Sequence, residues 1–172
     1  MKEYSKKQKT VGLIIGGLVF LIGIPIILVT VSLLIDERLH LSYLIPNPLN
    51  FVVAIIFIPP GFLFVIWSGF TQLMVGKGTP VPAIPAQRLV TTGPYRFCRN
   101  PMLLGTVIYY LGISFWINSI SAVMITVLFL MCSVMYIKFV EEKKLELSFG
   151  EEYKEYKKKT PFLIPHLKSK EI

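Results

Sequence analysis

Long uncharged apolar stretches dominate the hydrophobic pattern of this chain. Residues 11–35 and 51–75 contain no charged side chain, residues 102–117 are apolar but shorter, and residues 119–140 are apolar apart from Lys138. A transmembrane helix needs about 20 mostly apolar residues. The pattern therefore predicts an all-α, polytopic membrane protein with four transmembrane helices.

Two local features interrupt this pattern. The third and fourth stretches are separated by Asn118 alone, which predicts a tight turn and an antiparallel helical hairpin. Pro59-Pro60-Gly61 lies in the middle of the second stretch, where two prolines remove helix hydrogen bonds. This tripeptide is interpreted either as a kink used in packing or as an opening for a lipid chain.

Composition and charge agree with a membrane protein. The chain is 53% hydrophobic and 16% charged, whereas soluble domains are about 45–50% apolar and about 25% charged. Its length fits a single domain over residues 1–172. Every cation except Arg38 falls in the N-terminal tail, the loop before the third stretch or the C-terminal segment. The positive-inside rule places these three segments, and both termini, on the cytoplasmic side.

The net charge of +8 is therefore explained by topology and by attraction to anionic membrane lipids, without a nucleic-acid partner. No cysteine or histidine cluster has the spacing of a metal site. No charge lies in the middle of a predicted span, which argues against an ion pathway. Polar residues gather instead in two cytoplasmic segments, residues 76–101 and 138–165.

Candidate chemistry lies where these segments meet the third and fourth spans. Asn100 is a good N-cap and Pro101 a good first helical residue, so the positive end of the third span faces the cytoplasm beside Arg99. Arg99 and Glu141 lie at similar sequence distances from the turn at Asn118, so the hairpin brings them to one depth. A zwitterionic ligand with an amino-acid group and a ligand-free interhelical salt bridge both account for this set.

The segment after the fourth span predicts a helix end followed by a short helix. Gly150 suits a left-handed cap. Residues 151–159 carry Tyr153 and Tyr156 on one side and lysines on the other, which favours a helix lying at the membrane interface.

Two stretches are similar to one known group of enzymes. LVTTGPYRFCRNPMLLG (residues 89–105) resembles the signature of the isoprenylcysteine carboxyl methyltransferase and phospholipid methyltransferase group, in which Gly-x-Tyr precedes Arg-His-Pro-x-Tyr. Glu141-Glu142 followed by FGEEYKEYKKKTP (residues 149–161) resembles the group's glutamate pair and C-terminal helix. The order and spacing of both motifs agree.

This resemblance implies an S-adenosylmethionine-dependent membrane methyltransferase with a lipophilic or lipid acceptor. Residues 76–101 and 138–165 would form its cofactor-binding region. Glu141 would meet the cofactor's amino group or a ribose hydroxyl, with Glu142 as second choice. The other cofactor contacts implied by the motif are Gln87, Arg88, Leu89, Val90, Tyr95, Asn100, Pro101, Met102 and Leu103.

The chain departs from the group's pattern at three positions. Asn100 replaces the usual histidine and Leu103 the usual tyrosine, while Lys138 stands where carboxyl methyltransferases place a substrate-binding arginine. Arg99 and Lys138 are candidates for orienting the substrate, although Lys138 is also explained by snorkelling to the interface. Methyl transfer to an isoprenylcysteine-like acceptor is the leading interpretation. A phospholipid amine N-methyltransferase, or a non-enzymatic small transporter or assembly subunit, is the alternative.

Overall fold

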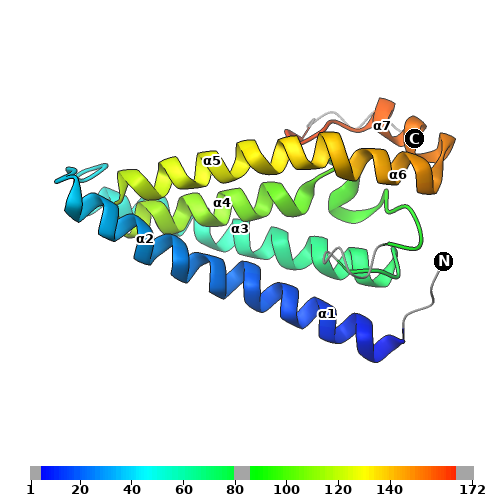
Figure 1. Cartoon of the computed structure of the whole chain (residues 1–172), viewed down its shortest axis with the longest axis horizontal. Helices are drawn as coiled ribbons and strands as arrows, with labels where there is room; N and C mark the ends of the chain where they lie inside the picture. Colours follow the sequence, from blue (N-terminus) through cyan, green and yellow to red (C-terminus); the bar gives the residue numbers. More distant parts are fainter. Residues whose placement is uncertain (1–4, 80–85, 166–172) are drawn as a thin grey trace.

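The chain folds into a helical bundle in the computed structural model, which describes residues 5–79 and 86–165 (Figure 1). The described residues contain no strand. In chain order the elements are α1 (Lys6–Leu18), the π-helical turn η1 (Val19–Gly23), α2 (Ile24–Arg38), α3 (Leu49–Met74), the 3₁₀ turn η2 (Gly93–Arg96), α4 (Pro101–Trp116), α5 (Ile120–Tyr136), the π-helical turn η3 (Ile137–Glu141), α6 (Glu142–Phe149) and α7 (Glu151–Lys159).

Three helical rods are long and apolar enough to cross a membrane: Lys7–Arg38, Leu49–Met74 and Ile120–Phe149. The third predicted span corresponds to α4, whose 16 residues fall short of this length. At about 1.5 Å per residue, α4 is roughly 24 Å long, against a hydrocarbon core of about 30 Å. The fold is therefore all-helical with three long apolar helices and one shorter one beside them.

The predicted hairpin turn forms between α4 and α5. Asn118 adopts a φ of 56°, and Ser119 caps α5 by accepting a hydrogen bond from the backbone N–H of Ala122 at 3.0 Å. The Asn118 amide also exchanges two hydrogen bonds with the backbone of Ile45, at 2.8 and 3.0 Å. The turn is thereby held to the loop between α2 and α3, which closes this end of the bundle.

Glycines allow α3 and α4 to pack closely along most of their length. A Cβ atom added at Gly61 would lie 2.5 Å from the backbone nitrogen of Tyr109, and one at Gly112 would lie 2.8 Å from that of Ile58. Pro59 and Pro60 are exposed, whereas Gly61 is buried. Because α3 continues as one helix through these residues, and Gly61 meets the backbone of α4, the structure supports a packing role for the tripeptide.

The π-helical turn η1 leaves backbone carbonyls without helical partners, and α4 satisfies them. The N–H of Ile24 bonds to the carbonyl of Val19, and Pro25 has no N–H, so the Phe20 carbonyl lacks a helical donor. Tyr110 donates its hydroxyl proton to this carbonyl at 2.8 Å. Tyr109 does the same for the Leu21 carbonyl at 3.1 Å, and these bonds tie the first rod to α4.

Candidate functional site

A buried ion pair joins the two predicted cytoplasmic segments. The guanidinium of Arg99, just before α4, contacts the carboxylate of Glu142 at the start of α6, and the two side chains are 11% and 8% exposed. Lys157 of α7 contacts the second Glu142 oxygen at 2.7 Å and Glu146 at 2.9 Å. These two hydrogen bonds raise the pKa of Lys157. The sequence-based expectation that cation and carboxylates converge is met, with Glu142 as the arginine's partner.

The π-helical turn η3 explains why Glu142 rather than Glu141 faces Arg99. The N–H of Glu142 bonds to the carbonyl of Ile137, five residues earlier. In an uninterrupted α-helix, the residue four positions after the buried Ile137 would follow it on the same face. That residue is Glu141. Because the π-helical turn is wider, Glu142 instead of Glu141 follows Ile137 on this face. Glu142 is therefore buried, and Glu141 is exposed.

Glu141 makes no hydrogen bond or ion pair with any residue in the described part of the chain. Its charge nevertheless acts on Tyr95 of η2. Burial raises the pKa of the Tyr95 phenol, and the nearby negative charge of Glu141 adds to this rise. The phenol donates to the Gln72 side chain at 3.0 Å. A free carboxylate therefore lies near a neutral tyrosine, next to the Arg99–Glu142 pair.

Asn100 precedes α4 as predicted, but its side chain does not cap the helix. The amide instead donates to the carbonyl of Phe162 at 2.9 Å. The prediction of side-chain capping is wrong because the C-terminal segment competes for the amide. Pro101 is the first helical residue, as expected. The next two N–H groups of α4, those of Met102 and Leu103, are left without a side-chain cap.

The C-terminal segment after α7 covers the tip of α4. Arg99 donates its backbone N–H to the Pro161 carbonyl at 2.9 Å and its side-chain Nε to the Thr160 carbonyl at 3.1 Å. The Phe162 ring lies 5.5 Å from the Arg99 guanidinium and 5.3 Å from the Nζ of Lys138. Arg99 and Lys138, the two candidates for orienting the substrate, thus both contact this segment. The contacts described for Arg99 are all with other residues of the protein.

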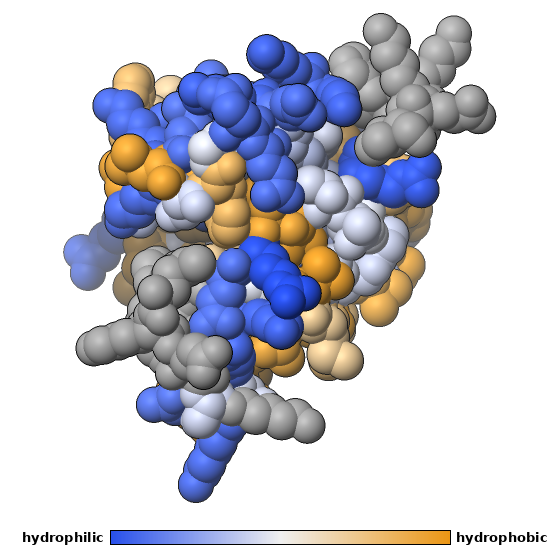
Figure 2. Space-filling model, turned by 90° about the vertical axis from the view of Figure 1, so that its right-hand side faces the viewer, coloured by the Kyte–Doolittle hydropathy of each residue, from blue (hydrophilic) through white to orange (hydrophobic). Residues whose placement is uncertain are grey.

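Helix α7 has the predicted bounds, and Gly150 before it has the expected positive φ, 57°. Its tyrosine face is turned toward the protein: Tyr153 and Tyr156 are buried. Tyr156 donates its hydroxyl proton to the backbone carbonyl of Tyr95 at 2.6 Å. This contact holds η2 against α7. Figure 2 shows polar residues gathered over this end of the bundle, with apolar residues behind them.

The predicted loop residues surround the end of α3. Gln87 and Arg88 donate their backbone N–H groups to the Gly76 carbonyl at 2.8 and 3.2 Å. The Gln87 side chain accepts from Lys9 of α1 at 3.4 Å. Leu89 is half-buried, Val90 is buried and the Arg88 side chain is exposed. The preceding residues 80–85 of the predicted cofactor-binding region, and residues 166–172, lie outside the described part.

Sequence reasoning missed Gln72 at the end of α3. Its side chain accepts from Tyr95 and donates to the Thr79 carbonyl at 3.3 Å. A glutamine at the end of an apolar span, close to a Gly- and Pro-rich loop, was the available signal. Its hydrogen bond with Tyr95 depends on the packing of α3 beside η2, which the sequence does not show.

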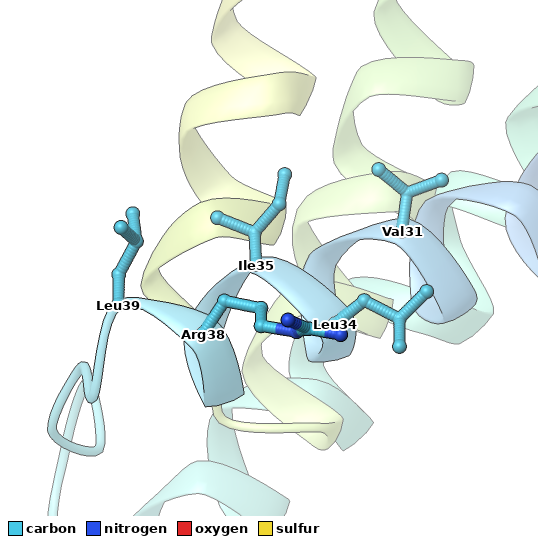
Figure 3. A pocket seen from close by; sticks show the side chains of 5 residues that line it. All are labelled: Val31, Leu34, Ile35, Arg38 and Leu39. Atoms are coloured by element: carbon cyan, nitrogen blue, oxygen red, sulfur yellow. The ribbon is translucent and has the colours of Figure 1, made fainter.

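Two hollows differ in their relation to this site. One, of about 370 Å³, is lined by five residues of α2 and its end, Val31, Leu34, Ile35, Arg38 and Leu39 (Figure 3). It lies at the end of α2, at the opposite end of the bundle from the start of α4 (Figure 1). The other, of about 70 Å³, lies between α1, α3 and α4 and reaches Met102. Only the second approaches the predicted site residues.

The residues that form this site lie within a region that matches a known protein family. Residues 49–152 match the model of the phospholipid methyltransferase family, which is more than half of the chain. The chain belongs to the phospholipid methyltransferase family. No curated protein matches the sequence significantly. The match runs from α3 to the first residues of α7, so it includes Tyr95, Arg99 and both glutamates.

Membership identifies the chain as one of a family of methyltransferases, and its long apolar helices are those of a multi-pass membrane protein. The family resemblance is thereby confirmed; the matched region contains residues 89–105 and the glutamate pair and ends at residue 152. Within the matched region, the π-helical turn divides the glutamate pair: Glu142 forms the buried ion pair with Arg99, and Glu141 forms no ion pair within the described residues.

Proposed function

We propose that this protein transfers a methyl group from S-adenosylmethionine to a lipophilic acceptor at the cytoplasmic face of the membrane. The observation that carries the proposal is the division of the glutamate pair. Glu142 neutralises Arg99 in a buried contact, while the Glu141 carboxylate near Tyr95 forms no hydrogen bond or ion pair within the described residues, although the positive charge of Lys144 acts on it. A free carboxylate at such a site suits an ammonium group.

The described residues fit the amino-acid part of such a cofactor. Glu141 would hold its ammonium group, and the uncapped N–H groups of Met102 and Leu103 at the positive end of α4 would hold its carboxylate. The loop residues Gln87 to Val90 would contact the nucleoside. Arg99 acts here as a positioning residue, because its Nε and Nη1 atoms already contact the C-terminal segment and Glu142.

S-adenosylmethionine supplies a methyl group already activated on a sulfonium, so the protein's task is positioning and the exclusion of water. The C-terminal segment over α4 supports both. Burial raises the pKa of Tyr95, so at neutral pH its phenol is protonated and serves as a donor, not as a base. A carboxylate acceptor needs no base, whereas an amine acceptor must lose a proton, which a nearby carboxylate accepts.

The proposed topology has four crossings and a single domain, with both termini in the cytoplasm. The α4–α5 hairpin requires α4 to cross despite its length, beside α3, against whose backbone it packs (Figure 1). Lysines and arginines exposed around the polar end support this orientation. The cofactor then enters from water and the acceptor from the bilayer.

Two acceptor classes remain distinct candidates. The family description favours a phospholipid amine. The stacking of Lys138 on Phe162 also turns that lysine away from the role of an arginine fork for a carboxylate. Incubation with a methyl-labelled cofactor and either phosphatidylethanolamine or N-acetyl-S-farnesylcysteine separates the two, because only the true acceptor becomes labelled. We expect phosphatidylethanolamine to be the acceptor that becomes labelled.

Cofactor binding is tested with purified protein in detergent, by calorimetry with S-adenosylhomocysteine. We expect binding by the wild type and a loss of about tenfold or more for Glu141→Gln, because charge-assisted hydrogen bonds contribute about 1.5–3 kcal/mol. Glu152→Gln is the matched control, since Glu152 is exposed on α7. Absence of binding by the wild type contradicts the proposal. Equal weakening by both variants contradicts the role of Glu141.

A further inference from the structure

The hollow that reaches Met102 is an apolar crevice in the half of the bundle nearest the polar end (Figure 1). It measures about 70 Å³, and no ionisable side chain lines it. The lining comes from the first rod, from the second half of α3 and from the first turn of α4; it includes Gly16, Gly17, Phe20, Gly69, Phe70 and Met102.

Missing side chains create this crevice. A Cβ atom added at Gly17 would have no atom within 4 Å, and one at Gly69 would meet only the Cδ1 atom of Leu13, at 3.4 Å. Elsewhere in α3, glycine positions are filled by a neighbouring backbone, as at Gly61. The space at Gly17 is therefore open, and it lies within rods that are long and apolar enough to cross a membrane.

The crevice reaches from α1 to the first turn of α4, which belongs to the candidate site. Met102 is the second residue of α4, next to the tip that carries Asn100 and Arg99. Above the crevice, one turn before Leu13 on α1, Lys9 contacts the side chain of Gln87. A cation and the predicted cofactor loop thus lie over the upper end, while the side chains that line the space below are predominantly apolar.

We propose that this crevice holds one hydrocarbon chain of the methyl acceptor and thereby places the acceptor's head group at the tip of α4. This inference rests on the proposed function. A space without hydrogen-bonding side chains inside the bilayer excludes polar ligands, because an unsatisfied polar group there is costly. Its narrow volume suits a single chain, so the second chain of a two-chain acceptor stays in the surrounding lipid.

The experiment fills the crevice at Gly17 and reads acceptor contact by photo-crosslinking. The probes are phosphatidylethanolamine and S-farnesylcysteine, each with a diazirine in one chain; phosphatidylglycerol with the same diazirine represents bulk lipid. Adducts are mapped by mass spectrometry in the full-length protein. We expect an acceptor probe, and not the bulk-lipid probe, to label residues 13–21 and 65–70 of the wild type.

Gly17→Leu should reduce this labelling by about fivefold or more, since the added side chain occupies space that the hydrocarbon chain would fill. Gly17→Ala should reduce it less. Gly23→Leu is the matched control: it lies on the same rod, its added Cβ would have no neighbour closer than 3.8 Å, and it does not line the crevice. All three variants should bind S-adenosylhomocysteine as the wild type does, which also verifies that they are folded.

Each result decides a different claim. Labelling that Gly17→Leu leaves unchanged, labelling confined to other segments, or equal labelling by phosphatidylglycerol overturns the crevice assignment while cofactor binding still supports a methyltransferase. Failure of the wild type to bind S-adenosylhomocysteine overturns the proposed function, and the acceptor assignment with it.

Discussion

Helix α3 meets two neighbours in opposite ways. On the side of α4, Gly61 of α3 packs against the backbone of Tyr109. Gly105 and Gly112 of α4 pack against α3 at similarly short range. Toward α1, α3 presents Gly69, opposite Gly17, and here a crevice remains. The same residue type therefore seals one interface and leaves space at the other.

The difference shows that the effect of a glycine on helix packing depends on how closely the neighbouring helix approaches it. Association of helices in lipid depends on van der Waals contact and hydrogen bonds, because lipid tails are as apolar as the side chains. Where two backbones approach, as between α3 and α4, glycine maximises contact. Where the neighbour stands back, as α1 does, glycine leaves a volume that a ligand can fill.

The largest expected effect is at the sealed interface. Gly61→Leu should destabilise the bundle by more than about 3 kcal/mol, because its side chain would collide with rigid backbone atoms of α4. Thermal unfolding in detergent, followed by tryptophan fluorescence, measures this loss. Stability equal to that of the wild type would show that α3 and α4 do not pack as closely as described.

The next largest expected effect is a difference in alkylation rate between the two cysteines, one buried and one exposed. Cys98, before the tip of α4, is fully buried, and burial raises the pKa of its thiol to about 11, whereas Cys132 on α5 is exposed. At pH 8 the Cys98 thiolate should be about a hundredfold scarcer than that of an ordinary cysteine, so alkylation should be slow.

The folded-state pKa of Cys98 lies above the ordinary value of 9.0, so its neutral thiol favours the folded state. This contribution to stability is complete below pH 9 and is lost as the pH rises through about 11. Alkylation with iodoacetamide, analysed by peptide mass spectrometry from pH 7 to 11, follows the change. Fast labelling of Cys98 at pH 8 in the folded protein would contradict a sealed tip.

A smaller effect is expected where α4 meets the first rod. Tyr110→Phe leaves the Phe20 carbonyl without a donor and should cost about 0.5–2 kcal/mol, the range measured for hydrogen bonds between membrane helices. Tyr136→Phe is the control, because Tyr136 is exposed on α5. Unfolding of both variants is compared in the same detergent. Equal stability of the two would remove the tyrosine bond as a link between the rods.

The smallest effect on stability is expected at the open interface. Gly17→Ala should change the unfolding free energy by less than about 1 kcal/mol, and in the stabilising direction, since alanine favours the helix and the added methyl group meets no atom. Unfolding measured beside Gly61→Leu gives the contrast directly. A destabilisation as large as that of Gly61→Leu would show that α1 also packs tightly on α3.

Much of the fold was predictable because the bilayer imposes simple rules on sequence. The apolar stretches gave the helices, Asn118 the hairpin turn, and Gly150 the boundary before α7. The prediction of side-chain capping went wrong because a distant segment competes for the side chain: the carbonyl of Phe162 accepts a hydrogen bond from the Asn100 amide. Contact with η2 likewise fixes Tyr156 of α7 against the protein.

By itself the sequence determined the helical composition, the hairpin, the family motifs and the meeting of Arg99 with an acidic pair. Only the tertiary structure decided which glutamate pairs with Arg99, and which glycines seal an interface or leave a crevice. The physical reason is that hydrophobic periodicity and turn chemistry are local, whereas a π-helical turn shifts every later side chain by one position. Whether a glycine meets backbone or empty space likewise depends on a helix far away in the chain.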